Sequence, residues 1–261
     1  MTTRGATGAT GIGEVQAPPA LEAHGIVKTF GPVVAVDGAS IELRSGQITA
    51  LVGNNGAGKS TLAKILCGAT EPDAGTIAVD GQQVKFRDPG HARQLGIRTV
   101  FQDLALVEQR DVAHNLFLGA EPTRFRFLVD RKLMDREATA ALNSLGVDVP
   151  SVNAQVRNLS GGQRQSIAVA RVSRAGGQII ILDEPTAALG VREAARVIDL
   201  MVRLRAQGLA LLLISHNIER DFDLADQIVV MRRGRTVATT RAGDTTKQEV
   251  VGMLMSGGSV R

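Results

Sequence analysis

The sequence predicts an α/β fold with a mainly parallel core sheet, an antiparallel β-subdomain and an inserted α-helical subdomain. Three patterns support this prediction. Short strand-like runs dominate residues 22–85, continuously apolar strands then alternate with helices, and residues 103–158 carry apolar side chains at helical spacing with few strand signals. Strands that are apolar throughout are typical of parallel sheets that are covered on both faces.

The antiparallel part comes first along the chain. Its strands read GIVKTF, ASIEL and TIAVDGQQV, and the last of these contains an Asp80-Gly81 hairpin turn. The first buried strand of the core, ITALV, leads into the glycine-rich segment GNNGAGKST and then into a helix, STLAKILCG. A further strand, GIRTVFQ at 96–102, precedes the helical subdomain.

The rest of the core follows the segment LSGGQRQ at 159–165. We expect a helix, the buried strand QIIILDE, a helix over about 191–207 that Gly208 stops, and the buried strand LALLLISH. A hairpin at 227–240 and a short helix from about 247 complete the fold.

These elements predict a single domain over residues 21–255. Residues 1–20 contain Gly, Thr, Ala and Pro without the apolar core of a secretory signal, so we expect a disordered tail and a cytoplasmic protein. Thr246 and Glu249 have capping-box spacing, which marks the start of the last helix, and residues 256–261 are expected to form a short tail.

The composition argues against several classes of protein. No apolar run reaches the 18 residues of a membrane helix. The net charge is +4, from 30 basic and 26 acidic residues, and there is no Trp or Tyr to stack on bases, so we expect no nucleic-acid partner. The single cysteine, Cys67, excludes an internal disulfide and a cysteine zinc site, and its apolar surroundings predict a buried packing residue.

Residues 53–60, GNNGAGKS, fit the phosphate-loop pattern G-x4-G-K-[ST]. In such a loop, N–H groups at a helix N-terminus surround a phosphate, Lys59 reaches the β and γ oxygens, and the Ser60 hydroxyl binds Mg²⁺. A plain glycine-rich turn with an exposed lysine is the alternative. The buried strand before the segment and the helix after it favour the phosphate loop.

Four polar side chains end neighbouring buried strands. Asp183 and Glu184 follow IIIL, His216 follows LLLIS, and Gln102 ends GIRTVFQ. Ligands bind beyond the carboxyl ends of parallel strands, so we expect Asp183 near Mg²⁺ and Glu184 near the attacking water. His216 is expected to hydrogen-bond the γ-phosphate and this water, and Gln102 to ligate Mg²⁺ or hold the water. Without the phosphate loop, a solvated Asp-Glu loop and a structural histidine would be the simpler interpretation.

The segment LSGGQ starts a second candidate anion site. Ser160 and Gln163 have capping-box spacing, and the free N–H groups of the helix start lie next to two glycines. A helix cap that needs no ligand is the alternative. The remaining histidines, His24, His91 and His114, lie in no such context and are expected on the surface.

In this order, GNNGAGKST, Gln102, LSGGQRQ, IIILDEPT and His216 resemble the five motifs of the nucleotide-binding subunit of ABC transporters, and the match covers about residues 22–255. The resemblance implies a P-loop NTPase fold, ATP and Mg²⁺ as cofactors, and ATP hydrolysis as the activity. The catalytic residues that it implies are Glu184 as general base, His216, Gln102 and Lys59. The metal ligands that it implies are Ser60, Gln102 and Asp183. The nucleotide contacts that it implies are Phe30, stacked on adenine, with Gly53, Asn54, Asn55, Gly56, Ala57, Gly58, Lys59, Ser60, Thr61, Ser160, Gly161, Gly162 and Gln163.

The resemblance also implies partners. Two such domains dimerise head to tail, with the signature LSGGQ of one covering the ATP held by the phosphate loop of the other. This chain has one phosphate loop and one signature, so it pairs with a second ATPase chain, either another copy or a different protein. Membrane permease subunits, and through them an extracytoplasmic solute-binding protein, are further implied partners, which places the chain at the inner face of the cell membrane.

Within the family, GNNGAGKSTLAKIL, DVAHNLFLG and EPTAALGVRE are similar to the ATPases of bacterial monosaccharide importers of the ribose, xylose, galactose and fructose type. Import of a simple sugar is therefore expected. The alternatives are an exporter subunit and a soluble ABC ATPase acting on nucleic acid or ribosomes. The second alternative is associated with paired cassettes or long coiled coils, which this sequence lacks. One departure from the family pattern is Gly190, where the D-loop usually carries Asp.

Overall fold

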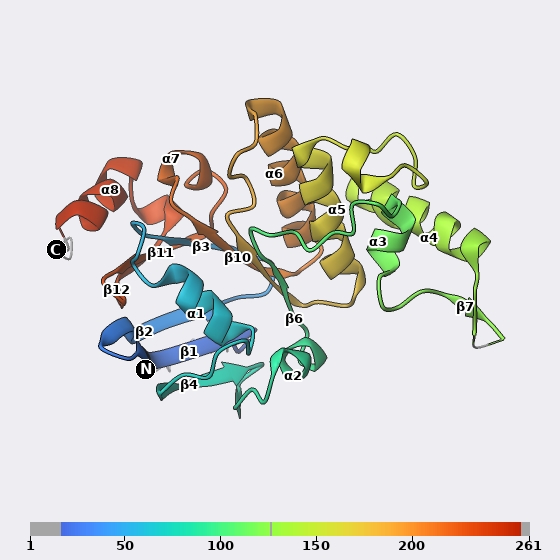
Figure 1. Ribbon diagram of the computed structural model, residues 1–261. Coiled ribbons are helices and arrows are strands. Elements are labelled where there is room, and N and C mark those ends of the chain that lie inside the picture. Colours follow the sequence, from blue (N-terminus) through green and yellow to red (C-terminus); the bar gives the residue numbers. More distant parts are fainter. Residues whose placement is uncertain (1–16, 126, 257–261) are drawn as a thin grey trace, which may run out of the picture.

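The computed structural model describes residues 17–125 and 127–256 (Figure 1). Its larger sheet has six strands in the order β12-β11-β3-β10-β9-β6. Neighbouring strands are parallel, except that β11 and β12 form an antiparallel hairpin at one edge. The strands are β3 (Ile48–Val52), β6 (Ile97–Val100), β9 (Ile179–Asp183), β10 (Ala210–Ser215), β11 (Gln227–Arg232) and β12 (Arg235–Arg241). The mainly parallel core sheet is therefore confirmed.

A second, antiparallel sheet has the order β2-β1-β4-β5, as the strand-like runs at the start of the chain predict. Its strands are β1 (Leu21–Phe30), β2 (Val33–Leu43), β4 (Ala74–Val79) and β5 (Gln82–Val84). The Thr236 hydroxyl of β12 donates to the Ser40 carbonyl of β2 at 2.8 Å, and the Asp37 N–H donates to the Gly234 carbonyl at 2.8 Å. These bonds join the two sheets.

Helices cover both faces of the six-stranded sheet. Successive residues of a strand point to opposite faces, so Ile180 and Leu182 of β9 pack in one apolar cluster with α5 and α6, whereas Ile179 and Ile181 pack in another with α1 and the antiparallel sheet. The helices of this core are α1 (Lys59–Leu66), α2 (Pro89–Gln94), α5 (Gly161–Arg174), α6 (Val191–Ala206), α7 (Ile218–Asp221) and α8 (Lys247–Ser256). As a result α1 and α5 lie on opposite faces of the sheet (Figure 1).

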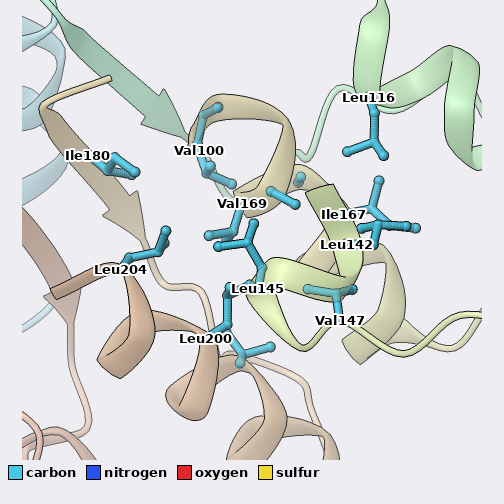
Figure 2. Close-up of a cluster of buried hydrophobic side chains, with 14 of the residues drawn as sticks. Val100, Leu116, Leu142, Leu145, Val147, Ile167, Val169, Ile180, Leu200 and Leu204 are labelled. Atoms are coloured by element: carbon cyan, nitrogen blue, oxygen red, sulfur yellow. The ribbon is translucent and has the colours of Figure 1, made fainter. Parts of the chain in front are cut away.

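The segment between β6 and α5 forms the helical region expected over 103–158, at one end of the molecule (Figure 1). It contains α3 (Val112–Phe117), the small hairpin β7 (Thr123–Arg124) and β8 (Leu128–Val129), and α4 (Arg131–Leu145). Figure 2 shows Leu116, Leu142, Ile167 and Leu200 converging from four different helices. Each fully buried side chain of this size contributes about 1.5–3 kcal/mol, so α5 binds the helical region firmly to the sheet.

The packed chain starts before the expected boundary at residue 21. Ala20 directly precedes β1. It is 3% exposed, and its carbonyl accepts a hydrogen bond from the Asp80 N–H at 3.2 Å. Of the tail predicted at 1–20, residues 1–16 lie outside the described residues, as do residues 257–261 of the C-terminal tail.

One of the histidines predicted on the surface, His24, is exposed, whereas His91 and His114 are half-buried. The His114 ring is held between α3 and α4, since its Nδ1 lies 2.9 Å from Asp111 Oδ2 and 2.6 Å from Arg131 Nη1. Asp111 also caps α3 by accepting the His114 N–H at 2.8 Å. His114 is therefore less exposed than predicted, because a long-range contact with α4 partly covers it.

Candidate nucleotide-binding site

The phosphate loop joins β3 to α1, and two of its glycines occupy positions that exclude a side chain. A Cβ at Gly53 would collide with the Met231 carbonyl oxygen, and a Cβ at Gly58 would collide with the Ala35 carbonyl oxygen. Gly58 also has a φ of 101°, which L side chains rarely adopt. These glycines let the loop pass close to two neighbouring strands and turn sharply into α1.

The Lys59 ammonium group folds back over the loop. The Lys59 side chain is buried, and its Nζ donates to the carbonyl oxygens of Gly53 at 2.7 Å and Asn54 at 3.2 Å. Burial lowers the pKa of Lys59, while the nearby carboxylates of Glu184 and Asp183 oppose this change. Phosphate oxygens would supply further anionic partners that favour the charged form of this ammonium group.

An open pocket of about 430 Å³ lies over the loop. Its walls are Asn55, Gly56, Ala57, Gly58, Lys59, Ser60, Thr61 and Glu184, with Val33, Val34 and Ala35 of β2. Sequence reasoning identified the loop residues but missed the three residues of β2. The exposed residues Val33 and Val34 form an apolar wall of the pocket. In the sequence, the pattern that could have indicated this wall is two branched apolar residues shortly after Phe30 and Gly31.

Phe30, the residue expected to stack on adenine, ends β1 and is 52% exposed. Lys28 Nζ lies 5.6 Å from the centroid of its ring, and Phe30 is not among the residues that line the phosphate-loop pocket. The structure thus leaves one aromatic face available near the pocket without placing it in the pocket wall.

Glu184 and His216 meet beyond the ends of β9 and β10. His216 Nδ1 lies 2.7 Å from Glu184 Oε1. Glu184 has a φ of 52°, a left-handed backbone conformation that costs about 1–2 kcal/mol in a residue other than glycine. A hydrogen bond from its N–H to the Ile214 carbonyl, at 2.9 Å, helps to hold this conformation. A carboxylate fixed beside an imidazole at the rim of a phosphate pocket is suited to accept a proton from water.

Asp183 and Ser60 supply oxygens of the type that Mg²⁺ prefers. Burial raises the pKa of the Asp183 carboxyl, and the neighbouring Glu184 raises it further, so this group gains from a nearby cation. Within the described residues, no three His, Cys, Asp or Glu side chains gather into a metal cluster. One carboxylate and one hydroxyl fit Mg²⁺, which combines one or two protein oxygens with phosphate oxygens and water.

Gln102 lies apart from these groups. The strand β6 ends at Val100, so Gln102 follows two residues later and does not end the strand as predicted. Its side chain is exposed, and Gln102 is not among the residues that line the phosphate-loop pocket. The structure therefore brings Lys59 and Glu184 together but leaves Gln102 outside the pocket.

The segment LSGGQ begins α5 as predicted. Ser160 is the N-cap, its Oγ accepts the Gln163 N–H at 3.3 Å, and Gln163 Oε1 accepts the Ser160 N–H at 3.1 Å. This reciprocal capping box uses one N–H group of the first turn of α5, that of Gln163. Gln163 also donates from Nε2 to the Asp148 carbonyl at 3.2 Å, which ties the helix start to the helical region.

A carboxylate of the neighbouring helix already lies at this helix start. The pKa of Glu193, on α6, is lowered first by the Ser160 hydroxyl and then by the N–H groups of Gly190 and Gly162. A Cβ at Gly162 would lie 2.7 Å from the Glu193 Cβ, so the glycine provides room for α6. The start of α5 thus stabilises a negative charge, and sequence reasoning missed Glu193 because the contact joins two helices.

The two glycine-rich helix starts lie at the same edge of the sheet but on opposite faces. Residues 175–178 connect α5 to β9, so α5 runs back along the strand and its start lies toward the carboxyl ends of the strands, like the phosphate loop. Figure 1 shows α1 and α5 separated by the sheet. None of residues 159–163 lines the pocket over the phosphate loop, so one chain does not bring the two sites together.

A family model described as ABC transporter matches residues 36–187, from β2 through the phosphate loop and LSGGQ to the segment after β9. The chain belongs to the ABC transporter family. Its ATPase domain combines a P-loop NTPase fold with the motifs for ATP binding and hydrolysis.

Two relatives match this ABC ATPase over most of both chains. The fructose import ATP-binding protein FrcA of Rhizobium meliloti is 44% identical over 244 residues, which cover 90% of this chain and 94% of that protein. The xylose/arabinose import ATP-binding protein XylG of Sulfolobus acidocaldarius is 43% identical, with the same coverage of each chain. The ribose import ATP-binding protein RbsA 1 of Rubrobacter xylanophilus is 42% identical, but the match spans 47% of its length.

Solved structures confirm the fold of the ABC ATPase. The ADP conformation of MJ1267, an ATP-binding cassette of an ABC transporter, has a TM-score of 0.78 and 25% identity and covers 91% of this chain and 95% of its own. The cassette MJ0796, in a dimeric structure of a post-hydrolysis state with ADP and Pi, has a TM-score of 0.72 at 21% identity. In the described part of the ATPase, no helix is both long and apolar enough to cross a membrane.

Gly190 of the ATPase replaces the usual D-loop Asp and serves as the N-cap of α6. The Gly190 N–H lies 3.4 Å from Glu193 Oε2, so the Glu193 side chain contributes to the cap at the start of α6. Before it, the Thr186 carbonyl accepts a hydrogen bond from Arg220 Nη1 at 3.1 Å. Arg220 and Glu193 therefore hold the two ends of the segment between β9 and α6.

Proposed function

We propose that this ABC ATPase powers the import of a simple sugar through a membrane permease. The observation that carries the proposal is the likeness to two sugar import ATP-binding proteins over 94% of the length of each. It acts from the cytoplasm, at the inner face of the membrane, and an extracytoplasmic binding protein delivers the sugar to the permease. The likeness to importers favours import over export and over a soluble role on nucleic acid or ribosomes.

Lys59 and the N–H groups of the phosphate loop bind the ATP phosphates, and Ser60 and Asp183 would hold a Mg²⁺ ion, which would neutralise part of the phosphate charge. Glu184 accepts the proton of the attacking water, and His216 orients the Glu184 carboxylate through the 2.7 Å contact. Phe30 offers its exposed ring face to adenine. Gln102 reaches Mg²⁺ or the water only after its segment moves toward the pocket.

The remaining part of each site comes from a second ATPase chain. The placement of Ser160 and Lys59 on opposite faces of one sheet supports a head-to-tail pair, in which the signature residues Ser160, Gly161, Gly162 and Gln163 of one chain cover the phosphate held by the other. A two-fold axis then creates two equivalent sites at once. The sequence allows a homodimer, and a different ATPase chain as partner is the alternative.

An open groove of about 360 Å³ beside Gln102 supports the permease as a partner. Its lining includes the apolar residues Ile97, Phe101 and Leu118 and the basic residues Arg93 and Arg98. A permease segment with apolar side chains and an acidic group would complement this surface. The groove adjoins the segment after Gln102. Movement of this segment toward the nucleotide can therefore change the shape of the groove.

Mixing two inactive variants tests the shared site. Lys59→Ala removes the phosphate contact and Ser160→Arg blocks the signature, so each variant alone should be inactive. A mixed dimer combines the intact loop of the Ser160→Arg chain with the intact signature of the Lys59→Ala chain, and random pairing should restore roughly a quarter of the wild-type rate. Mixtures that stay inactive, although both variants fold and dimerise, would rule out composite sites.

Reconstitution tests the transport role. In vesicles that contain the permease and sugar-loaded binding protein, we expect ATP hydrolysis to rise with sugar and to drive sugar uptake. Glu184→Gln should dimerise on ATP but lose hydrolysis by about 100-fold or more, because a general base contributes 10²–10⁴-fold. Stimulation by DNA or ribosomes, together with no response to the permease, would contradict the proposal.

A further inference from the structure

Two arginines of α5 face the helical region and contact different backbone segments. Arg171 donates from Nη1 to the Ala105 carbonyl at 2.8 Å and from Nη2 to the Leu104 carbonyl at 2.9 Å. Arg174, three residues later, donates from Nε to the Leu116 carbonyl at 3.1 Å, at the end of α3. The first arginine therefore binds the chain just after Gln102, and the second binds α3.

The segment after Gln102 has no regular secondary structure through Val107, so helix and sheet bonds do not hold its carbonyls. Asp103 Oδ1 accepts the Ala105 N–H at 3.0 Å, and Ala105 has a φ of 48°. This tight turn presents the carbonyls of Leu104 and Ala105 to the same side, toward Arg171. Arg171 joins this turn to the signature helix through two hydrogen bonds, and Leu104 and Leu106 pack against the apolar cluster that includes that helix.

The guanidinium group of Arg171 hydrogen-bonds these two carbonyls and forms no ion pair within the described residues. Burial lowers the pKa of Arg171 without a carboxylate to oppose it. A guanidinium group has a planar fork of donors that reaches two adjacent acceptors, whereas a lysine ammonium is a single point of donation. Burying a cation is costly unless it is hydrogen-bonded, and the carbonyls of Leu104 and Ala105 supply these hydrogen bonds to Arg171.

We infer that Arg171 is a positioning residue that transmits the position of Gln102 to the signature of the same chain. Ser160 lies about three helical turns before Arg171 on α5, and a continuous helix transmits displacement as a rigid body. When Gln102 moves toward the nucleotide in its own phosphate loop, the two carbonyl contacts carry α5 and Ser160 with it. The signature is thereby aligned for the partner chain's nucleotide.

This inference deepens the proposed function, since it relies on the role of Gln102 there. Arg174 provides a matched control, because it lies on the same helix, is also partly buried and also binds a backbone carbonyl, but the carbonyl belongs to α3. Its guanidinium group also lies 3.8 Å from the centroid of the Phe117 ring. Loss of Arg174 therefore removes a backbone hydrogen bond and a ring contact without touching the segment after Gln102.

Kinetics of Arg171→Met, Arg171→Lys and Arg174→Met test the inference. We expect Arg171→Met to lower kcat on the order of tenfold with KM changed less than about twofold, Arg171→Lys to recover part of the rate, and Arg174→Met to stay within about twofold of wild type. In a Gln102→Ala background, Arg171→Met should cause little further loss, because both changes break the same connection. Equal losses from Arg171→Met and Arg174→Met, or additive losses in the double variant, would overturn it.

Hydrogen exchange gives a readout that needs only nucleotide binding. In the wild-type protein, ATP should change the protection of residues 103–106 and of residues 160–164 together. In Arg171→Met the change at 103–106 should remain, while the change at 160–164 should disappear. If the signature still responds in Arg171→Met, the inference fails even where ATP hydrolysis and transport behave as proposed. If Gln102→Ala hydrolyses ATP normally, the role of Gln102 in the proposed function fails, and the exchange data decide on Arg171 separately.

Discussion

The two glycine-rich helix starts of this ATPase use glycine for different physical reasons. In the phosphate loop, Gly53 and Gly58 allow the backbone to pass against carbonyl oxygens of neighbouring strands, and Gly58 has a backbone conformation that L residues rarely adopt. In the signature, Gly161 and Gly162 belong to the first turn of α5, and Gly162 provides room for Glu193 of α6. The first site depends on loop geometry, whereas the second depends on the fit between two helices.

Gly58→Ala should cause the largest effect. The new Cβ would collide with the Ala35 carbonyl oxygen at a φ of 101°, so neither a side-chain movement nor a small rotation relieves it. We expect ATP affinity, measured by titration with a fluorescent analogue, to fall at least about 100-fold. Gly56→Ala is the control, because Gly56 also has a positive φ, 78°, but a Cβ there meets nothing within 4 Å. Similar losses in both variants would mean that strain alone, and not the close approach, makes glycine necessary.

Gly162→Ala should separate binding from turnover. Its Cβ would lie 2.7 Å from the Glu193 Cβ and 3.2 Å from the Glu193 Cα, so α5 and α6 must move apart. Affinity for ATP at the chain's own loop should stay within about twofold, while hydrolysis should fall roughly tenfold. Gly161→Ala meets only Leu189 Cδ2, at 3.2 Å, and this flexible side-chain end can move, so it should have a smaller effect. A large loss of ATP affinity in Gly162→Ala would contradict the division between the two sites.

Ser160→Ala should reduce stability modestly. It removes the Oγ that accepts the Gln163 N–H, and loss of an N-cap of this kind typically lowers the free energy of unfolding by about 1 kcal/mol. Denaturant unfolding with a binding titration should show a lower midpoint and unchanged ATP affinity. Thr246→Ala removes the matching cap of α8, where the Glu249 N–H lies 3.2 Å from Thr246 Oγ1, and serves as a control remote from the signature. If Thr246→Ala lowers turnover as much as Ser160→Ala, the signature serine acts only as a cap.

Asp73→Asn should give the smallest effect, and that effect should depend on pH. Asp73 accepts from Lys28 Nζ, and from the hydroxyl and N–H of Thr29, just before Phe30. The Lys28 contact is the main cause that lowers its pKa from 3.8 to about 2. Since the folded pKa is below the unfolded one, this stabilisation is complete above about pH 4 and is lost as the pH falls through about 2.

Thermal unfolding across pH checks this expectation. Asp73→Asn should lower Tm near neutral pH, and the difference from wild type should shrink between about pH 4 and pH 2. Glu71→Gln is the control, because Glu71 pairs with the exposed Lys85 and should matter less. A difference that is constant down to pH 2 would show that the carboxylate charge is not what anchors the end of β1.

Much of the fold followed from local patterns in the sequence. The apolar runs ITALV, IIILD and LALLLIS predicted buried parallel strands, and their shared edge predicted that Glu184 and His216 lie at the same end of the sheet, although the contact between them was not predicted. The phosphate loop and the start of α5 were also predicted, because glycine and capping patterns act within a few residues.

The unpredicted features depend on contacts between distant segments. Nothing in the local sequence places Glu193 beside the signature or Val33 beside the phosphate loop, because each contact joins separate elements. His114 is half-buried for the same reason, since α4 packs over it. Gln102 lies outside the pocket, at the start of an irregular segment that contacts Arg171, a residue about 70 positions later.

The placement of the phosphate loop and the signature on opposite faces of one sheet has a kinetic consequence. Under the shared-site proposal, a lone chain has half of each of two sites and no turnover, whatever the ATP concentration. In dilute solution the total rate should then rise with the square of the protein concentration, and become linear once dimers saturate. Fixing two ATPase chains on one permease removes this second-order step, so assembly at the membrane would itself act as the switch that turns hydrolysis on.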